Sequence, residues 1–80
     1  MIKFEDMSKL EIDEYGTKRY YNSKGQLHRK NNPAIIYQAG SIFWYINDKC
    51  HRIDGPSCVY VIGDKFWFLE GNCIRKFEYD

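Results

Sequence analysis

The sequence contains little that would support catalysis, a metal site or insertion into a membrane. Its 80 residues have no Gly-rich phosphate loop, no nucleophile elbow and no metal-carboxylate pattern. The three cysteines and two histidines show neither Cys-x-x-Cys nor His-x(3–5)-His spacing, which common zinc sites use. No apolar run approaches the roughly 18 residues of a membrane span. We therefore expect a protein that is not an enzyme, holds no metal or cofactor and does not enter a membrane.

The charge balance is nearly even, which argues against one large class of partners. The chain has 12 Lys and Arg residues and 11 Asp and Glu residues, giving a formal net charge of +1. A generic polyanion binder carries a larger positive charge, although a local basic stripe is compatible with a neutral total. The opening segment 1–6 is too polar for a signal peptide, so we expect a cytoplasmic protein.

What the sequence does contain is one 23-residue unit written twice, as His28–Cys50 and His51–Cys73. The eight identical pairs are His28/His51, Arg29/Arg52, Pro33/Pro56, Tyr37/Tyr60, Gly40/Gly63, Phe43/Phe66, Trp44/Trp67 and Cys50/Cys73. Subtracting the same offset once more places Tyr21 at the position of Trp44, and Leu27 at that of Cys50, in a degraded first copy with a shortened turn and no proline. We interpret the chain as a single domain, 1–80, with a degraded repeat at about 5–27, repeats at 28–50 and 51–73, and a C-terminal cap at 74–80.

Each unit has the pattern of a β-hairpin bounded by turn residues. The boundaries are Asn31-Asn32-Pro33 and Asp54-Gly55-Pro56, where proline removes a ladder donor and the chain must re-enter the sheet. The expected strands are 34–38, 41–47, 57–62 and 65–70, with hairpin turns at 39–40 and 63–64 and short turns at 47–48 and 71–72. In the first segment a strand over 10–15 competes with a helix over 8–14, the repeat favours the strand, and residues 1–4 form an edge strand or a short arm. The prediction is an all-β fold, an antiparallel meander of tandem hairpin repeats in one twisted sheet.

Alternation along the strands predicts which side chains share a face of this sheet. One face is expected to carry Ile42, Trp44, Ile46, Lys65, Trp67, Leu69 and Tyr21, and the other Phe43, Tyr45, Phe66, Phe68 and Tyr20. Both faces are therefore apolar in the second and third copies. Cys50 and Cys73 stand where the first copy has Leu27, so we expect reduced thiols that act as small buried hydrophobes.

The motifs HRIDGPS at 51–57, FWYINDK at 43–49 and FWF at 66–68 carry a resemblance to a known family. They resemble the tandem "H-R-x-D-G-P-A … W-Y-x-N-G-K" repeat of tailed bacteriophages and large DNA viruses, which is similar to MORN-type repeats. The resemblance covers about residues 15–73 and implies stacked β-hairpins in a single twisted sheet. The earlier copy departs from it, because Asn31-Asn32-Pro33 replaces Asp-Gly-Pro and no Trp precedes Trp44. By analogy, so small a viral domain implies a phage-encoded anti-defence factor, such as an anti-CRISPR or anti-restriction protein, that binds and inhibits a host protein.

The repeated His-Arg pairs are candidates for binding this partner. His28, Arg29, His51 and Arg52 would form a row of donors suited to acidic groups. In the alternative interpretation, which periodic residues favour, arginine pairs locally with Asp54 or a strand-end carbonyl and histidine packs on a tryptophan. The aromatic candidates at the centre of an interface, acting with Arg29 and Arg52, are Tyr20, Tyr45 and Tyr60.

Tyr21, Trp44 and Trp67 recur at the repeat period and form a predicted aromatic ladder. Cross-strand aromatic pairs hold a sheet together, and this structural role is the favoured interpretation. The alternative function is a single-stranded nucleic-acid-binding module, since aromatic rings beside basic side chains suit unpaired bases. Its residues would be Lys18, Arg19, Tyr21, Lys24 and Lys30. A further alternative is a self-associating structural repeat domain, a homodimer through an open sheet edge or an apolar face.

Overall fold

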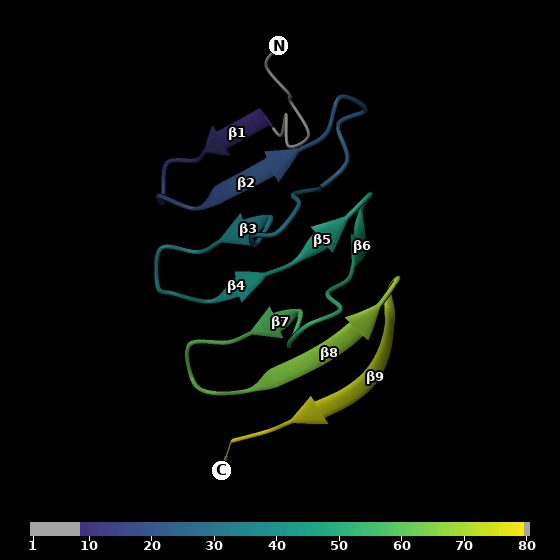
Figure 1. Ribbon diagram of the computed structural model, residues 1–80. Helices are drawn as coiled ribbons and strands as arrows, with labels where there is room; N and C mark the ends of the chain where they lie inside the picture. The colour runs from purple at the N-terminus through teal and green to yellow at the C-terminus, as the bar shows by residue number, and fades with distance from the viewer. Residues whose placement is uncertain (1–8, 80) are drawn as a thin grey trace.

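The structure is a computed structural model that describes residues 9–79, and this part of the chain consists of strands and turns without a helix (Figure 1). Its strands are β1 (Lys9–Ile12), β2 (Lys18–Tyr21), β3 (Ile35–Ile36), β4 (Ile42–Phe43), β5 (Tyr45–Ile46), β6 (Lys49–Cys50), β7 (Cys58–Val59), β8 (Lys65–Leu69) and β9 (Asn72–Phe77). Seven of these strands form one antiparallel sheet in the order β1-β2-β3-β4-β7-β8-β9, and β5 pairs with β6 in a separate hairpin. The predicted all-β antiparallel meander is confirmed. The first described segment is a strand rather than the competing helix, and the prediction for residues 1–4 lies outside the described residues.

The same wide turn closes the hairpin of each unit, on the left in Figure 1. In the second unit the Tyr37 N–H donates to the Ser41 carbonyl over 2.9 Å, and the Gly40 N–H donates to the Tyr37 carbonyl over 3.0 Å. The glycine of each wide turn has a φ between +83° and +114°, a left-handed conformation that glycine adopts without steric cost. The same two bonds are made in the first unit by Asp13, Gly16 and Thr17 and in the third by Tyr60, Gly63 and Asp64.

The first unit is one residue longer in its second turn, so the offset between units changes along the chain. The glycines of the first two wide turns are 24 residues apart, whereas Leu27 and Cys50 are 23 apart. Tyr21 bridges to Leu27 across the five residues 22–26, and Tyr45 pairs with Cys50 across four. The predicted shortening of a turn in the first copy is therefore wrong. The wide turn has its full length, and the extra residue lies at 22–26.

This shift puts Tyr20, rather than Tyr21, at the position of Trp44. The Tyr20 N–H donates to the Ala34 carbonyl over 2.8 Å, just as the Trp44 N–H donates to the Ser57 carbonyl over 2.7 Å. Side chains alternate along a strand, so Tyr20 shares the face of Trp44 and Tyr21 lies on the opposite face, the reverse of the predicted assignment. The corrected ladder is Tyr20, Trp44 and Trp67.

The second turn of the later units is a two-residue hairpin turn. Asn47 and Asp48 have φ values of +49° and +68°, and Glu70 and Gly71 have +47° and +86°. Two successive positive φ values are typical of a type I′ turn, which matches the twist of the flanking strands. The sequence analysis placed the turn of the third unit at 71–72, but the turn is formed by Glu70 and Gly71. The prediction was one residue too late because it put Gly71 in the first position of the turn, whereas Gly71 occupies the second.

Replacing Glu70 with asparagine should stabilise the protein. A left-handed conformation costs an ordinary L-residue roughly 1–2 kcal/mol, and asparagine tolerates it better. We expect Glu70→Asn to raise the free energy of unfolding by roughly 0.5–1 kcal/mol, measured by urea unfolding followed by circular dichroism. The reciprocal Asn47→Glu should lower it by at least as much, because Asn47 also accepts a hydrogen bond from Asn22. Stabilisation by both changes would contradict the turn geometry.

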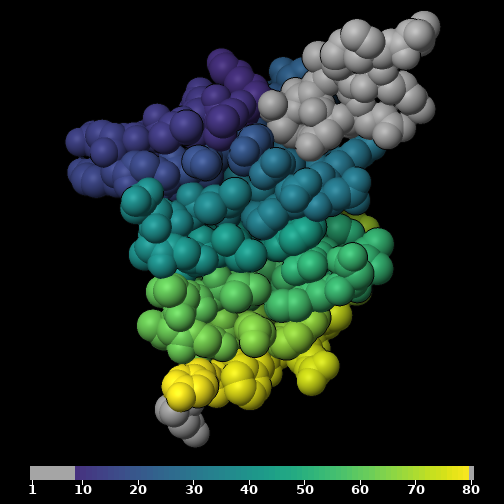
Figure 2. Space-filling view, turned by 60° about the vertical axis from the view of Figure 1, so that its left-hand side comes forward, coloured from purple at the N-terminus to yellow at the C-terminus, as the bar shows by residue number. Residues whose placement is uncertain are grey.

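The units cross the molecule as successive bands in chain order (Figure 2). The molecule measures 48 × 29 × 20 Å, and within residues 9–79 six side chains make up the buried set. The buried core is small, and its members lie in or beside β2, β3, β6 and β7. They are Thr17, Ala34, Ile35, Cys50, Ser57 and Cys58. Cys50 is buried as predicted, but Cys73 is exposed because it lies on the outermost strand.

Candidate protein-binding surface

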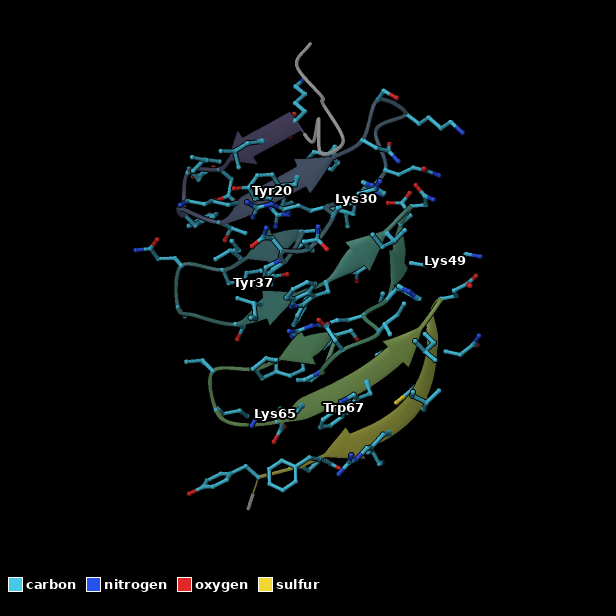
Figure 3. All side chains as sticks on the ribbon, in the orientation of Figure 1. Tyr20, Lys30, Tyr37, Lys49, Lys65 and Trp67 are labelled. Carbon is cyan, nitrogen blue, oxygen red and sulfur yellow. The ribbon has the colours of Figure 1, made fainter. Side chains whose placement is uncertain are left out.

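Three arginines lie over the rings of the corrected ladder, on one face of the sheet. The guanidinium carbon of Arg52 is 3.8 Å from the centroid of the Trp44 ring, within the range of a cation–π interaction. The same contact recurs in both neighbouring units, where the pairs are Arg29 with Tyr20 at 3.8 Å and Arg75 with Trp67 at 4.8 Å. We call these three pairs the arginine–aromatic ladder, and Figure 3 labels its two outer rings. Each arginine lies over the flat face of its ring, and a nucleic-acid base would have to stack on such a face.

The first two ladder arginines also hold the boundary loops. Arg52 Nη1 donates to the Pro56 carbonyl over 3.1 Å, and its Nε donates to Asp54 Oδ1 over 3.1 Å. Arg29 Nη1 donates to the Pro33 carbonyl over 3.3 Å. The predicted local pairing of arginine with Asp54 or a strand-end carbonyl is confirmed. The Asp54 side chain is 82% exposed, so its ion pair adds little, and the carbonyl and ring contacts do most to fix the loop.

The two histidines hold the two-residue hairpin turns at 47–48 and 70–71, which we call the tight turns. His28 Nδ1 accepts a hydrogen bond from the Asn47 N–H over 3.1 Å, and His51 Nδ1 accepts one from the Glu70 N–H over 3.0 Å. Each histidine thereby ties the beginning of its unit to the turn near its end. The side chain found over Trp44 is the arginine, whereas the sequence-based interpretation placed a histidine on a tryptophan.

The opposite face carries rings in edge-to-face contact. The ring centroids are 5.4 Å apart between Tyr37 and Phe43, 5.2 Å between Phe43 and Tyr60, and 5.7 Å between Tyr60 and Phe66. Such pairs add roughly 0.5–1.5 kcal/mol beyond the area they bury. We call these four rings the aromatic stripe, and Tyr37 is labelled in Figure 3. Burial raises the pKa of the Tyr60 hydroxyl, although 38% of the residue is exposed.

A pocket of about 300 Å³ opens on the face of the aromatic stripe. Besides three rings of the stripe, it is lined by Tyr45, Phe68 and the thiols of Cys50 and Cys58. Burial raises the pKa of the Tyr45 hydroxyl as well. The pocket is therefore apolar except for its phenol and thiol groups.

β9 is one of the two edge strands of the sheet, β1 being the other, and it is exposed along its whole length. All six of its residues are exposed, including the apolar Ile74 at 60% and Phe77 at 50%. Its inner side pairs with β8, and the sheet of residues 9–79 has no strand on its outer side. This edge therefore offers backbone donors and acceptors to a further strand.

The backbone groups of Lys76 point outward from this edge. The Ser57 N–H donates to the Phe66 carbonyl over 2.8 Å, so the backbone of Phe66 faces β7. Backbone groups alternate in direction along a strand, so those of the two flanking residues of β8 face β9. The β9 residues opposite them, Arg75 and Phe77, point back toward β8. Lys76, which lies between these two, has its N–H and C=O on the open side.

The predicted partner-binding residues do not form one surface. The ladder holds Tyr20, Arg29 and Arg52, and the two histidines hold the tight turns. Tyr45 and Tyr60 lie on the face of the aromatic stripe. Tyr60 is exposed, and the other predicted residues are half-buried.

The residues of the nucleic-acid hypothesis are also dispersed. Lys18 and Arg19 are neighbours in β2 and therefore point to opposite faces. Arg19 Nη1 donates to Asp13 Oδ2 over 2.9 Å, and this bond holds the pKa of the Asp13 carboxyl below its ordinary value. The remaining members lie in a turn (Lys24), beside a boundary loop (Lys30) and on the face opposite the ladder (Tyr21).

The length and exposure of β9 were not predicted from the sequence, which indicated a short turn into a half-strand and assigned residues 74–80 to a cap. In the second repeat the equivalent stretch 51–56 leaves the sheet as a boundary loop that contains glycine and proline. Residues 74–77 contain neither, so the chain continues along β8. The absence of these turn residues is the signal that would have predicted the strand.

No protein-family model, curated protein or solved structure matches the chain. Within residues 9–79 no helix is long and apolar enough to cross a membrane. In the same part of the chain, no three or more His, Cys, Asp or Glu side chains are grouped so that they could hold a metal ion.

Proposed function

We propose that the chain is a non-enzymatic protein-binding module whose partner adds an extended segment to the outer edge of β9. One observation carries this proposal: a six-residue strand that is exposed throughout and unpaired on its outer side in the described sheet. Natural proteins protect such edges with very short strands, proline, bulges or charge, because an open edge is a template for another strand. β9 is of ordinary strand length and contains no proline. It has a bulge at Ile74 and the charges of Arg75 and Lys76, but residues 75–77 pair with β8 in regular register, so the open side of this part keeps the geometry of a strand. Its backbone is therefore suited to recognition by strand addition.

The side chains of β9 define the chemistry of the partner. Arg75 and Lys76 are consecutive, so their charges lie on opposite faces of the sheet. Opposite charges across neighbouring strands stabilise the pair by roughly 0.2–1 kcal/mol, and like charges destabilise it. Ile74 and Phe77 add exposed apolar surface beside them. The edge therefore favours an extended segment with acidic and apolar residues over a neutral or basic one.

The resemblance to phage and large-virus repeats supports a finer proposal, that the partner is a host protein and that binding inhibits it. On this proposal the chain is a phage-encoded anti-defence factor that acts in the host cytoplasm, as an anti-CRISPR or anti-restriction protein does. Strand addition would inhibit by occupying a segment that the host protein needs for its own assembly or activity.

Replacing Lys76 with proline should abolish partner binding while the domain stays folded. Proline removes the outward N–H and keeps the inward backbone bonds of Arg75 and Phe77, a position where edge strands tolerate proline. Tagged wild-type protein is used to capture partners from a bacterial lysate at low and high salt, with nuclease treatment in parallel. Affinity for the captured protein is then measured for each variant. We expect Lys76→Pro to bind roughly tenfold or more weakly, the effect of losing one or two main-chain hydrogen bonds.

Lys76→Ala is the matched control, because it removes the same side chain and keeps the N–H. It should lose affinity only at low salt, where the charge matters most. Circular dichroism verifies that both variants fold. A partner that binds Lys76→Pro as tightly as the wild type would refute strand addition. A partner that is lost with Tyr60→Ala instead would move the site to the aromatic stripe.

The two alternative functions predict different outcomes of the same experiment. Single-stranded nucleic acid has less support, because the ladder arginines lie over the ring surfaces on which bases would stack. Nucleic acid captured alone, and released steeply by salt, would favour that hypothesis. Self-association through β9 would give a dimer in light scattering of the purified protein, and Lys76→Pro would convert it to a monomer.

A further inference from the structure

Two cysteine thiols, one on each side of the boundary turn at 54–56, lie in contact on the face of the aromatic stripe. The sulfur atoms of Cys50, at the end of β6, and Cys58, at the beginning of β7, are 3.1 Å apart and are not joined by a disulfide. Each residue is 8% exposed. Both line the pocket of about 300 Å³ described above, which leads from solvent to the pair.

The repeat shows that the fold does not require thiols at these places. Twenty-three residues earlier the corresponding positions are Leu27 and Ile35, an apolar pair. The third cysteine, Cys73, corresponds to Cys50 but lies exposed on β9, where its thiol contacts the Arg75 carbonyl at 3.6 Å. Of these equivalent positions, only Cys50 has a second sulfur atom beside it. Leu27 and Ile35 show the same place filled by apolar side chains, and Cys73 is a thiol without a neighbouring cysteine for comparison.

The two sulfur atoms have different acid strengths. The hydrogen bond with the Cys58 thiol lowers the pKa of Cys50 below its ordinary value, against the opposing effect of burial. The same bond and burial raise the pKa of Cys58. Cys50 is therefore the more acidic of the two thiols, and the thiolate is the nucleophilic form of cysteine. Cys58 remains a thiol beside it, placed to attack a modified Cys50.

We propose that Cys50 and Cys58 form a dithiol that reacts with a hydroperoxide and closes into a disulfide between β6 and β7. The Cys50 thiolate attacks one oxygen of hydrogen peroxide and breaks the O–O bond, which leaves a sulfenic acid on Cys50 and releases hydroxide. The Cys58 sulfur then attacks the Cys50 sulfur, so that the S–S bond forms, the S–O bond breaks and water leaves. In total the two thiols lose two protons and two electrons, and one hydrogen peroxide becomes two waters.

The disulfide would fasten the loop 51–57 to the sheet. This loop contains the boundary turn that the ladder arginine also holds. A cross-link between Cys50 and Cys58 lowers the conformational entropy of the unfolded chain. It also replaces the two thiols that line the aromatic pocket with a disulfide. Oxidation therefore stabilises the second repeat and changes the surface of the aromatic stripe, independently of any partner at β9.

The test uses the full chain carrying Cys73→Ser, so that only the proposed pair can react. We expect equimolar hydrogen peroxide to remove both remaining thiols, to lower the intact mass by two hydrogen atoms and to yield a peptide in which Cys50 is linked to Cys58. The melting temperature should rise by roughly 5–15 °C and return to its initial value with a dithiol reductant.

The matched control is Cys50→Leu with Cys58→Ile, which installs the residues of the first unit and should melt near the reduced wild type. Peroxide should leave its melting temperature and its Cys73 thiol unchanged under the same conditions. The proposal would be overturned if the Cys73→Ser protein kept both thiols, or if it gained oxygen on Cys50 without forming the disulfide. A disulfide that formed only between two molecules would overturn it too.

Discussion

Replacing Trp44 with alanine should remove a large part of the stability of this domain. Trp44 is the central ring of the arginine–aromatic ladder, with Arg52 over one surface, and it lies where the second and third units meet, as its backbone hydrogen bond to the Ser57 carbonyl shows. Truncation of a large core aromatic costs roughly 3–5 kcal/mol, and we expect about 3 kcal/mol for this half-buried ring. A domain of this length has a total of roughly 4–12 kcal/mol. The variant should unfold far below the wild-type temperature.

Urea unfolding followed by far-ultraviolet circular dichroism measures this loss. Tyr15→Ala is the control, because Tyr15 is 74% exposed and should change the free energy of unfolding by less than about 0.5 kcal/mol. Trp67→Ala should cost less than Trp44→Ala, since its neighbour β9 is the exposed edge strand. A Trp44→Ala protein that unfolds at the wild-type temperature would contradict the structural role of the ladder.

Trp44→Phe tests the contribution of the indole N–H to stability separately from that of the aromatic ring. Among residues 9–79, Trp44 Nε1 is buried and has no hydrogen-bond partner. An unsatisfied buried donor costs roughly 1–3 kcal/mol, and phenylalanine removes that cost while it gives up part of the packing area. We therefore expect Trp44→Phe to be close to neutral.

The parts of the fold that follow from local conformational demands could be predicted from the sequence. Gly40 and Gly63 mark the wide turns, because a positive φ needs glycine there, and Pro33 and Pro56 mark where the chain re-enters the sheet. Their common spacing established the repeat, the all-β class and the antiparallel order. These conformational signals act within a few residues of the chain and do not depend on which strands pair with each other.

The exact register could not be predicted in the same way. A single extra residue at 22–26 shifts the alignment of everything before it, and a one-residue shift moves each side chain to the other face of a sheet. That shift exchanged the roles of Tyr20 and Tyr21. Only the pairing of Tyr20 with Ala34, a contact between distant residues, shows which tyrosine belongs to the ladder.

The candidate site was hardest to predict because repetition points to the wrong residues. Arg52 and His51 recur in the sequence because each unit needs them for its own turns and loops, so their polar groups are engaged inside the protein. The β9 edge is exposed because no further unit covers it in the described sheet. The candidate site therefore lies where the pattern stops.

Arg52→Ala should be the second most damaging single change, because this side chain joins the ladder to the boundary loop. Its guanidinium donates to the Pro56 carbonyl, and a hydrogen bond from a charged donor contributes roughly 1.5–3 kcal/mol. The cation–π contact with Trp44 adds roughly 0.5–2 kcal/mol, and the side chain is only 23% exposed. We expect a loss of about 2–3 kcal/mol in the same urea assay.

Two further variants show which contact is responsible. Asp54→Ala should change little, because that carboxylate is largely in solvent. Arg52→Lys should lose nearly as much as Arg52→Ala, since an ammonium group cannot lie flat on the ring while it donates to the loop. A fully stable Arg52→Lys protein would show that charge alone is sufficient.

A double-mutant cycle connects this prediction with the first. If Arg52 acts mainly through the Trp44 ring, the loss in Trp44→Ala, Arg52→Ala should be smaller than the sum of the two single losses by roughly 0.5–2 kcal/mol. Gly55→Ala provides an independent approach, because its Cβ would lie 2.9 Å from the Arg52 guanidinium carbon and would displace the group. Its cost should fall in the Arg52→Ala background, where nothing remains to be displaced. Additive effects in both cycles would mean that Arg52 holds its loop without help from the ladder.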